Sequence, residues 1–479
     1  MKNRYWLVVS FVLVLPIVLF FSFSKKVAKT ESATASVKTS AIQTSAIQPS
    51  TATPTLVPPL VPQHSIAIQN WSTANGARVY FVATEGIPII DVQVNFDAGS
   101  ARDAEKPGLA TLCIHLLDQG ILNANADLIA EKFEDSGAKF SVDVDRDRSI
   151  ISLRSLTDPK LLNPVIALYA DLISNPTFPE NNIETQRNQM LIGLQRNLQQ
   201  PNTVASQAFF KALYKNHPYA EPAYGTIESV SLITKTDLVQ FHQRYFVAKN
   251  ATITIVGGVS KEQATDIANQ ISQKLPTGNL ATPLPNVEPL TESVNINISF
   301  PTEQTHVLTG QPCATENDPD YFPLLVGNNI LGGGMLTSRL FNEVRNDRGL
   351  AYNVISAVLQ LQKPAPFVIR LQTKNSQTQE AITVLQNTLV KFINEGPTEQ
   401  EVFEAKQAIT RSFPIEISNN EKITDVVSLM GFYQLPLDSL ATYQKQVDAV
   451  TIAEIKSAFQ RRINPAKLGL IVVGTTTSP

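Results

Sequence analysis

Cysteine and long basic runs are scarce in this sequence of 479 residues. The two cysteines, Cys113 and Cys313, lie in separate halves of the chain and form no CxxC pair, so the sequence predicts neither a disulfide framework nor a thiolate zinc site. The net charge is −3 and no run rich in Lys and Arg occurs, which argues against nucleic acid as a partner. With 43% hydrophobic and 17% charged residues, the composition is that of a globular protein, and the length suggests two or more domains.

Charge is also missing from a run near the N-terminus, Tyr5 to Phe23. Lys2 and Arg4 precede this run and three lysines follow it, a pattern typical of a signal peptide or of an uncleaved signal anchor over residues 1–29. We favour the anchor, because the run is long enough to span a bilayer and no small-residue cleavage site follows it directly. A short N-terminal tail usually stays inside. The remainder is therefore expected on the periplasmic side of a bacterial cell envelope, anchored in the inner membrane.

Composition divides the rest of the chain into a spacer and two halves. Residues 30–63 are rich in Ser, Thr, Ala and Pro and nearly uncharged, so they bury too little apolar surface to become ordered and are predicted to be a disordered spacer. Residues 64–274 are predicted to form the first domain, with strands followed by helices. Four prolines within 275–290 indicate an inter-domain linker. Strands and then helices return in a second domain, 291–479.

The two halves end in similar segments. LITKTDLVQFHQRYFVAKNATITIVGG and AVTIAEIKSAFQRRINPAKLGLIVVGT align without a gap when Gly257 is placed opposite Gly474, an offset of 474 − 257 = 217 residues. Thr234 then stands opposite Thr451. Each segment has the pattern of a capped amphipathic helix followed by an apolar strand that stops at glycine. A whole helix–strand unit repeated at a constant offset predicts two copies of one domain.

Four stretches, in this order, resemble the pitrilysin family of zinc peptidases: NFDAGSARD, PGLATLCIHLLDQG, NHPYAEPAYGTIESV and GGGMLTSRLFNEVRNDRGLAYNV. The resemblance covers roughly residues 65–475 and is strongest to the smaller bacterial members and the mitochondrial processing peptidase. It implies an α+β fold of two homologous halves. Each half is expected to be a mostly antiparallel sheet packed with helices, and the halves are expected to face each other across a central chamber for an extended peptide.

The resemblance also implies a zinc site, and this sequence has lost most of it. Active members carry H-x-x-E-H, in which two histidines on one helix face bind the ion and the glutamate is the general base. Thr111, Ile114 and His115 stand at the first histidine, the glutamate and the second histidine. Gly193 stands where a later helix supplies the third ligand, and Asp118 is a weak substitute. We therefore predict no metal in this chain, with the site repurposed as core.

The second half keeps a pair of residues that the family directs at substrate. Arg345 and Tyr352 in NEVRNDRGLAY are seven residues apart, the spacing of an Arg/Tyr pair that projects toward the metal site. The resemblance implies that Tyr352 contacts the scissile carbonyl and that Arg345 orients the peptide. A phenol and a guanidinium suit this task because both donate hydrogen bonds to an oxygen that gains charge. In the structural alternative, Tyr352 packs within a strand and Arg345 caps a helix end.

Lost ligands combined with a retained pair predict the non-metal subunit of a heterodimeric peptidase. Zinc is then expected on a paralogous partner subunit, and the substrate is an extended peptide or unfolded protein bound partly at a sheet edge. Two alternatives remain open. The chain could be a non-catalytic peptide-binding or structural scaffold of the same fold, which has no need of the pair. It could also be a zinc peptidase with atypical ligands that include His115.

Overall fold

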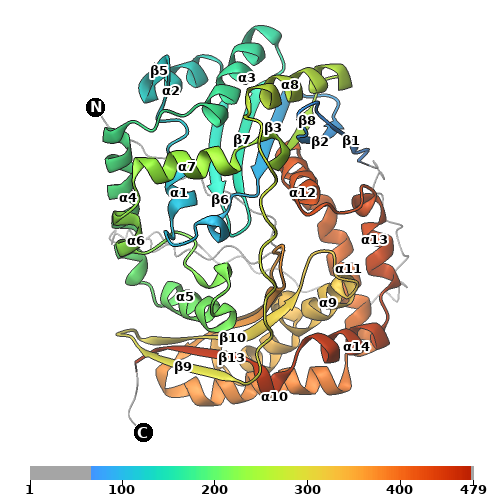
Figure 1. Ribbon diagram of the computed structural model, residues 1–479. Coiled ribbons are helices and arrows are strands. Elements are labelled where there is room, and N and C mark those ends of the chain that lie inside the picture. The colour runs from blue at the N-terminus through green and yellow to red at the C-terminus, as the bar shows by residue number, and fades with distance from the viewer. Residues whose placement is uncertain (1–65, 476–479) are drawn as a thin grey trace, which may run out of the picture. The chain divides into compact units, whose positions relative to one another are not determined.

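The computed structural model describes residues 66–475. The predicted anchor or signal peptide (1–29) and the predicted spacer (30–63) lie outside the described residues. Within residues 66–475, no helix is both long and apolar enough to cross a membrane. This part of the chain belongs to one compact unit, which contains two large mixed sheets and the helices that cover them (Figure 1).

The first half is built on a six-stranded sheet of order β1-β2-β8-β3-β7-β6, in which only β2 and β8 are parallel neighbours. Its strands are β1 (Gln69–Ser72), β2 (Arg78–Ala83), β3 (Ile89–Phe96), β6 (Lys139–Val144), β7 (Ser149–Leu156) and β8 (Ala251–Gly257). A small hairpin joins β4 (Gly120–Ile121) to β5 (Ala124–Asn125). The helices are α1 (Leu109–Ile114), α2 (Ala126–Asp135), α3 (Pro159–Ser174), α4 (Glu180–Leu198), α5 (Pro201–Tyr214), α6 (Ile227–Ser231), α7 (Lys235–Tyr245) and α8 (Lys261–Lys274).

The second half has a five-stranded sheet of order β11-β12-β10-β13-β9, in which β13 and β9 are parallel. Its strands are β9 (Val294–Ser299), β10 (Gln304–Ala314), β11 (Ala351–Val358), β12 (Ala365–Lys374) and β13 (Gly469–Gly474). Its helices are α9 (Tyr321–Asn328), α10 (Thr378–Glu395), α11 (Glu399–Glu416), α12 (Asn420–Tyr433), α13 (Ser439–Ala449) and α14 (Ile452–Arg462). The α+β fold with two mostly antiparallel sheets is the one expected from the sequence.

The repeat predicted from the sequence is present as matched elements. Helices α7 and α14 both begin with a capping box, in which Thr234 and Thr451 are the N-cap residues. Each threonine side chain accepts a hydrogen bond from the backbone N–H three residues on, at Asp237 and Glu454 respectively. Each helix leads into a strand that ends at glycine, β8 in one half and β13 in the other. The prediction of two homologous halves is confirmed.

Each sheet is covered on one face by a helix from the other half. Helix α12 of the second half packs on β2, β3 and β8, while α5 of the first half packs on β10 and β13 (Figure 1). Ile423 and Val427 of α12 form a buried cluster with Tyr80 of β2. In return, Phe209 and Leu213 of α5 are buried among side chains of the second sheet. Neither half therefore completes its own core.

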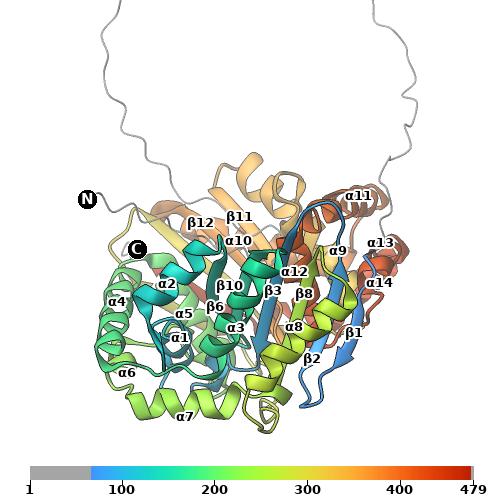
Figure 2. The ribbon, with the colours of Figure 1, turned by 90° about the horizontal axis from the view of Figure 1, so that it is seen from above.

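This exchange of helices, in which each half covers the sheet of the other, explains why strand β2 is apolar at every central position. Val79 and Phe81 belong to the cluster that also holds side chains of α3 and α8, whereas Tyr80 and Val82 contact the α12 side. Successive side chains point to opposite faces of a sheet, so a strand covered on both faces loses the alternation of polar and apolar residues. In Figure 2, α3 and α8 lie on one side of β3 and β8, and α12 lies on the other.

The segment between α8 and β9 contains no helix or strand, as the prolines suggested. It is nevertheless bound to the first half, because the backbone oxygen of Thr282 accepts a hydrogen bond from Arg102 at 2.6 Å. Leu284 and Leu290 are buried in the same cluster as side chains of α5. The linker is thus held at a few points, although its boundaries at 275–290 stay a prediction.

Candidate functional site

The remnant of the metal motif lies on α1, a short helix that is buried at every position. Thr111 and Ile114 are 2% and 0% exposed, respectively. The Thr111 hydroxyl donates a hydrogen bond to the backbone oxygen of Ala223 at 3.1 Å, which satisfies its polar group. The helix ends at Ile114, so His115 stands at the C-cap with an exposed side chain. Two of the motif positions are core residues, and the remaining histidine lies outside the helix.

Gly193 lies inside α4 and faces open space. A Cβ atom added there would meet no other atom within 4 Å, so packing does not require a glycine at this position. Asp118, the weak substitute ligand, instead accepts a hydrogen bond from Gln119 at 2.6 Å. Within residues 66–475, no group of three or more His, Cys, Asp and Glu side chains is placed to hold a metal ion. A hydroxyl, an aliphatic chain, a glycine and one imidazole do not fit zinc.

Two further histidines and one cysteine of the first half serve its packing. The ring of His242 is buried, with Nε2 2.7 Å from the backbone oxygen of Ile173, and burial lowers its pKa to about 4. His217 Nε2 lies 3.1 Å from the backbone oxygen of Pro285, in the segment between the halves. Cys113 is fully buried, which raises the pKa of its thiol far above the ordinary value. None of the three is available as a ligand for an ion in solvent.

Arg345 and Tyr352 are brought together in the second half. Arg345 belongs to a π-helical turn, η6 (Phe341–Asn346), and Tyr352 is the second residue of β11. The guanidinium carbon of Arg345 is 4.8 Å from the centroid of the Tyr352 ring and 4.6 Å from that of Phe341. Cation–π contacts of this kind hold both groups in place. No hydrogen bond or ion pair within the described residues engages the Arg345 side chain, so it caps no helix end there.

The backbone around Tyr352 is irregular. The pairing of β11 with β12 shifts by one residue between Ala351 and Asn353, which makes Tyr352 the extra residue of a β-bulge. Gly349 has a φ of 62° and forms the turn that leads from η6 into β11. Bulges and single π-helical turns are frequent at functional sites because they re-aim a side chain. Tyr352 is 69% exposed, which leaves it no role in the core.

A cavity of about 830 Å³ runs along the outer edge of the first sheet. Edge strand β6 supplies residues 139–143 of its wall, and α2 supplies another part. Helix α12 of the second half contributes Thr424 and Asp425. Asp118, close in sequence to the degenerate motif, also lines it, whereas Arg345 does not. A free sheet edge beside a cavity is the arrangement that binds an extended peptide by strand addition.

Carboxylates outnumber cations in the lining of this cavity. They are Asp91, Asp118, Asp127, Glu134, Asp143, Glu421 and Asp425, against Lys139, Arg148 and Arg154. Asp91 is paired with Arg154 at 2.7 Å. Burial raises the pKa of Asp425 to about 7, even though Gln93 donates a hydrogen bond to it at 3.1 Å. The cavity wall is therefore predominantly negatively charged, and a bound peptide would contact this negative surface.

Asp147 joins the two halves and was missed at the sequence level. It lies in the turn between β6 and β7 and is 1% exposed. Its carboxylate accepts hydrogen bonds from Tyr219 at 2.5 Å, from Tyr433 of α12 at 3.1 Å and from the backbone N–H of Gln362 at 2.7 Å. Burial raises its pKa to about 7. The only signal in the sequence is the ionisable run DVDRDRS, which is ordinarily a solvated turn.

Comparison with known proteins identifies the fold. Residues 78–227 match the family model described as Insulinase (Peptidase family M16), and residues 232–409 match that described as Peptidase M16 inactive domain. A crystal structure described as a peptidase M16 inactive domain from Pseudomonas fluorescens is 35% identical, with a TM-score of 0.83, over 86% of this chain and 98% of that chain. The chain belongs to the peptidase M16 family. The resemblance to pitrilysin-type peptidases is thereby confirmed.

Curated M16 relatives include peptidases and a non-peptidase by name. The non-peptidase homolog YmxG of Helicobacter pylori is 28% identical over 80% of this chain and 88% of its own length. The uncharacterized zinc protease YmxG of Bacillus subtilis is 25% identical over 74% of this chain and 86% of its own length. With the matched inactive-domain model and the altered α1 residues, the chain is an M16 peptidase homologue of the inactive-domain type.

Proposed function

We propose that this M16 homologue is the zinc-deficient subunit of a heterodimeric peptidase. It binds an extended peptide and presents Arg345 and Tyr352 to a paralogous partner subunit that carries zinc. One observation carries the proposal: the two halves differ in what they expose. Thr111 and Ile114 have become core residues, while Tyr352 stays 69% exposed on a bulge beside Arg345.

The chemistry of the pair supports this role. The Tyr352 hydroxyl makes no hydrogen bond within residues 66–475, so its proton is available to an oxygen of a bound peptide. The Arg345 guanidinium, held against the ring, adds a fixed positive charge nearby. Donors aimed at an oxygen that gains charge are among the strongest contributions to catalysis, and removing one costs about 2.7–4 kcal/mol of barrier. No step of this proposal needs a metal ion bound to this chain.

The cavity along β6 supports the peptide-binding part of the proposal. Main-chain hydrogen bonds to the free edge would supply affinity, and the cavity wall would receive alternate side chains. The test uses a binding peptide and a copy that is N-methylated at alternate residues. The N-methylated copy keeps every side chain but loses backbone donors, so its affinity is expected to fall. Equal affinity for both peptides would contradict strand addition.

The cellular location is part of the same proposal. We place the chain on the periplasmic face of a bacterial inner membrane, held by residues 1–29, because these residues have the charge and length of a signal anchor. Protease is expected to digest the folded part in spheroplasts, whose outer membrane has been opened, and not in intact cells. Resistance of the chain in intact spheroplasts would place it inside the cell.

The partner is tested by co-purification. The tagged full-length chain is expected to recover a paralogue with an intact H-x-x-E-H motif, with zinc bound to that paralogue. Hydrolysis of peptides is expected from the mixed complex and not from this chain alone. About one zinc per chain in the isolated protein, lost on His115→Ala, would instead favour a peptidase with atypical ligands. Peptide binding without turnover in every complex would favour the scaffold.

A further inference from the structure

A second cavity, of about 430 Å³, lies among α9, α11, α12 and α13 of the second half. Its volume is within the range of roughly 300–1,000 Å³ that is typical of small-molecule sites. Strand β6, Arg345 and Tyr352 take no part in its lining. The cavity is therefore not explained by the proposed peptidase role, and its lining indicates what it holds.

Four aromatic rings line this cavity: Tyr321 and Phe322 of α9, Phe413 of α11 and Tyr443 of α13. The Phe413 and Tyr443 rings are stacked with centroids 4.5 Å apart, and Phe322 meets Tyr443 edge-on at 5.8 Å. All four side chains are only partly buried, so they leave ring surface facing the cavity. The negative face of an aromatic ring attracts a cation and also accepts apolar groups.

The charged residues of the lining all have one sign. They are Glu316, Asp318, Glu416 and Asp438, with no Lys, Arg or His among them. Asp318 is paired with Arg462 outside the lining, at 2.7 Å. Among the described residues, the other three carboxyl groups have no cation within ion-pair distance. A cavity that gathers uncompensated carboxyl groups and aromatic rings has a negative potential and an apolar wall.

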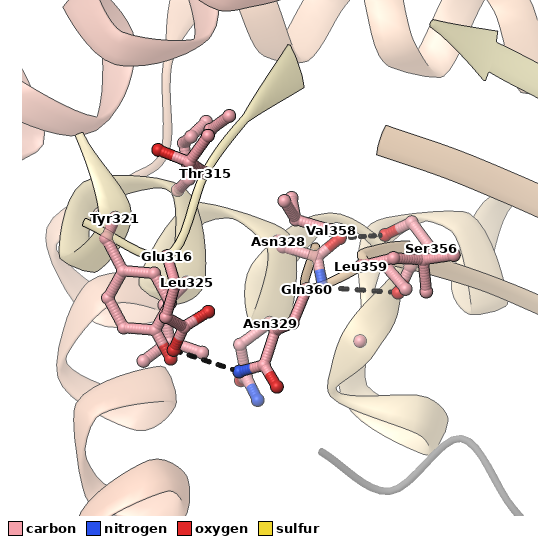
Figure 3. A pocket seen from close by; sticks show the side chains of 14 residues that line it. Thr315, Glu316, Tyr321, Leu325, Asn328, Asn329, Ser356, Val358, Leu359 and Gln360 are labelled. Atoms are coloured by element: carbon pink, nitrogen blue, oxygen red, sulfur yellow. Dashed lines mark hydrogen bonds between the residues drawn. The ribbon is translucent and has the colours of Figure 1, made fainter. Parts of the chain in front are cut away.

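Glu316 is a partly buried member of this group of carboxyl groups. Burial raises its pKa to about 7, although Gln360 donates a hydrogen bond to it at 3.1 Å and the Tyr321 hydroxyl is also bonded to it. Figure 3 shows Glu316 next to Tyr321 and Gln360, where a smaller neighbouring pocket shares these residues. A positive charge nearby would favour the carboxylate form, so a cationic ligand would release a proton from Glu316 on binding.

We propose that the cavity between α9, α11, α12 and α13 binds a small organic ammonium ion with an aromatic or aliphatic body. The ammonium group lies near Glu416 and Asp438, and the body lies against Phe413 and Tyr443. Neutral molecules of the same shape bind more weakly and anionic ones are rejected, because neither gives the carboxyl groups a counter-charge. The proposal does not depend on the peptidase role or on a partner subunit.

Three probes of similar shape test the charge requirement on the full-length chain by calorimetry: tryptamine, tryptophol and indolepropionate. Tryptamine is expected to bind at least about tenfold more tightly than tryptophol, and indolepropionate not measurably, because the cation–π and carboxylate attraction belong to the amine alone. The heat of tryptamine binding near pH 7 is expected to depend on the ionisation enthalpy of the buffer. Equal affinity for tryptamine and tryptophol would overturn the proposal.

Variants locate the site. Glu416→Gln combined with Asp438→Asn is expected to weaken tryptamine binding by about tenfold or more and to leave tryptophol unchanged. Glu404→Gln is the matched control, because Glu404 is exposed on the same helix α11 and lies outside the lining. Phe413→Leu, which keeps a large apolar side chain, should also weaken tryptamine. Unchanged tryptamine affinity in the carboxyl variant, with an unaltered melting temperature, would refute this site.

Discussion

Loss of a carboxylate of the family's zinc site has had different packing consequences at Gly193, the position of a ligand, and at Ile114, the position of the general base. Ile114 is fully enclosed in the core of the first half, whereas Gly193 leaves open space beside α4. Introducing a carboxylate would therefore cost little stability at Gly193 and much stability at Ile114. We therefore make a separate prediction for each position.

Gly193→Ala is expected to raise the free energy of unfolding by about 0.5–1 kcal/mol, because a glycine inside a helix costs conformational entropy and the new Cβ meets nothing. Urea denaturation measures it. Gly431→Ala is the matched control on α12, where the new Cβ would lie 2.7 Å from the Tyr80 ring and should destabilise the protein. A loss of stability in Gly193→Ala would show that α4 is more tightly packed than described.

Ile114→Glu, which restores the general base of the family, is expected to lower the free energy of unfolding by on the order of 3–5 kcal/mol. The reason is that the new carboxylate would be buried without a partner. Ile114→Val is the control and should cost about 0.5–1.5 kcal/mol. Chemical denaturation of both variants checks the difference. A stable Ile114→Glu protein would mean that α1 can open to solvent.

At the scale of elements, the sequence predicted local features, such as helix caps and strand ends. It did not predict that α5 and α12 each pack on the sheet of the other half. The capping threonines Thr234 and Thr451 and the glycines that end the two strands could be recognised, because caps and strand ends leave residue-specific signals. The periodicity of α5 and α12 shows that one face is buried but not which sheet covers it. The bulge at Tyr352 could not be recognised either, because it lies at the second residue of β11, where no alternating pattern precedes it whose phase could shift.

The exchanged helices predict that neither half folds alone. A fragment of residues 66–290 lacks α12, so Tyr80 and Val82 would lose their cover. A fragment of residues 291–479 lacks α5. Each fragment is expected to be aggregated or proteolytically labile by itself, and the two together are expected to form a soluble complex when co-expressed. Size-exclusion chromatography distinguishes these outcomes. Cooperative thermal unfolding of either fragment alone would contradict the exchange.

At the scale of the whole molecule, Asp147 makes the contact between halves sensitive to pH. Its folded-state pKa is raised by burial from 3.8 to about 7. The folded protein therefore holds this proton more tightly than the unfolded chain, and the contribution of Asp147 to stability falls as pH rises from about 4 to about 7. This group could not be predicted from the sequence, because only the fold brings Tyr433 and Gln362 to it.

Asp147→Asn removes this titration. The unfolding free energy of the wild type minus that of the variant is expected to decrease as pH rises from 4 to 7, by at most about 1.4 kcal/mol per pH unit. Urea denaturation at several pH values measures the slope. Asp266→Asn is the control, because Asp266 is exposed on α8. A pH-independent difference for Asp147→Asn would show that its carboxyl does not titrate differently in the folded state.

The most direct test of the central claim is the rate of peptide hydrolysis by the complex of this chain with its zinc-bearing partner. Tyr352→Phe and Arg345→Ala in this chain are each expected to lower kcat by about 10²–10³, because each removes a donor to the reacting carbonyl. Tyr224→Phe and Arg348→Ala, which change exposed residues of the same types, are expected to leave the rate unchanged. Full activity in both Tyr352→Phe and Arg345→Ala complexes would contradict the account.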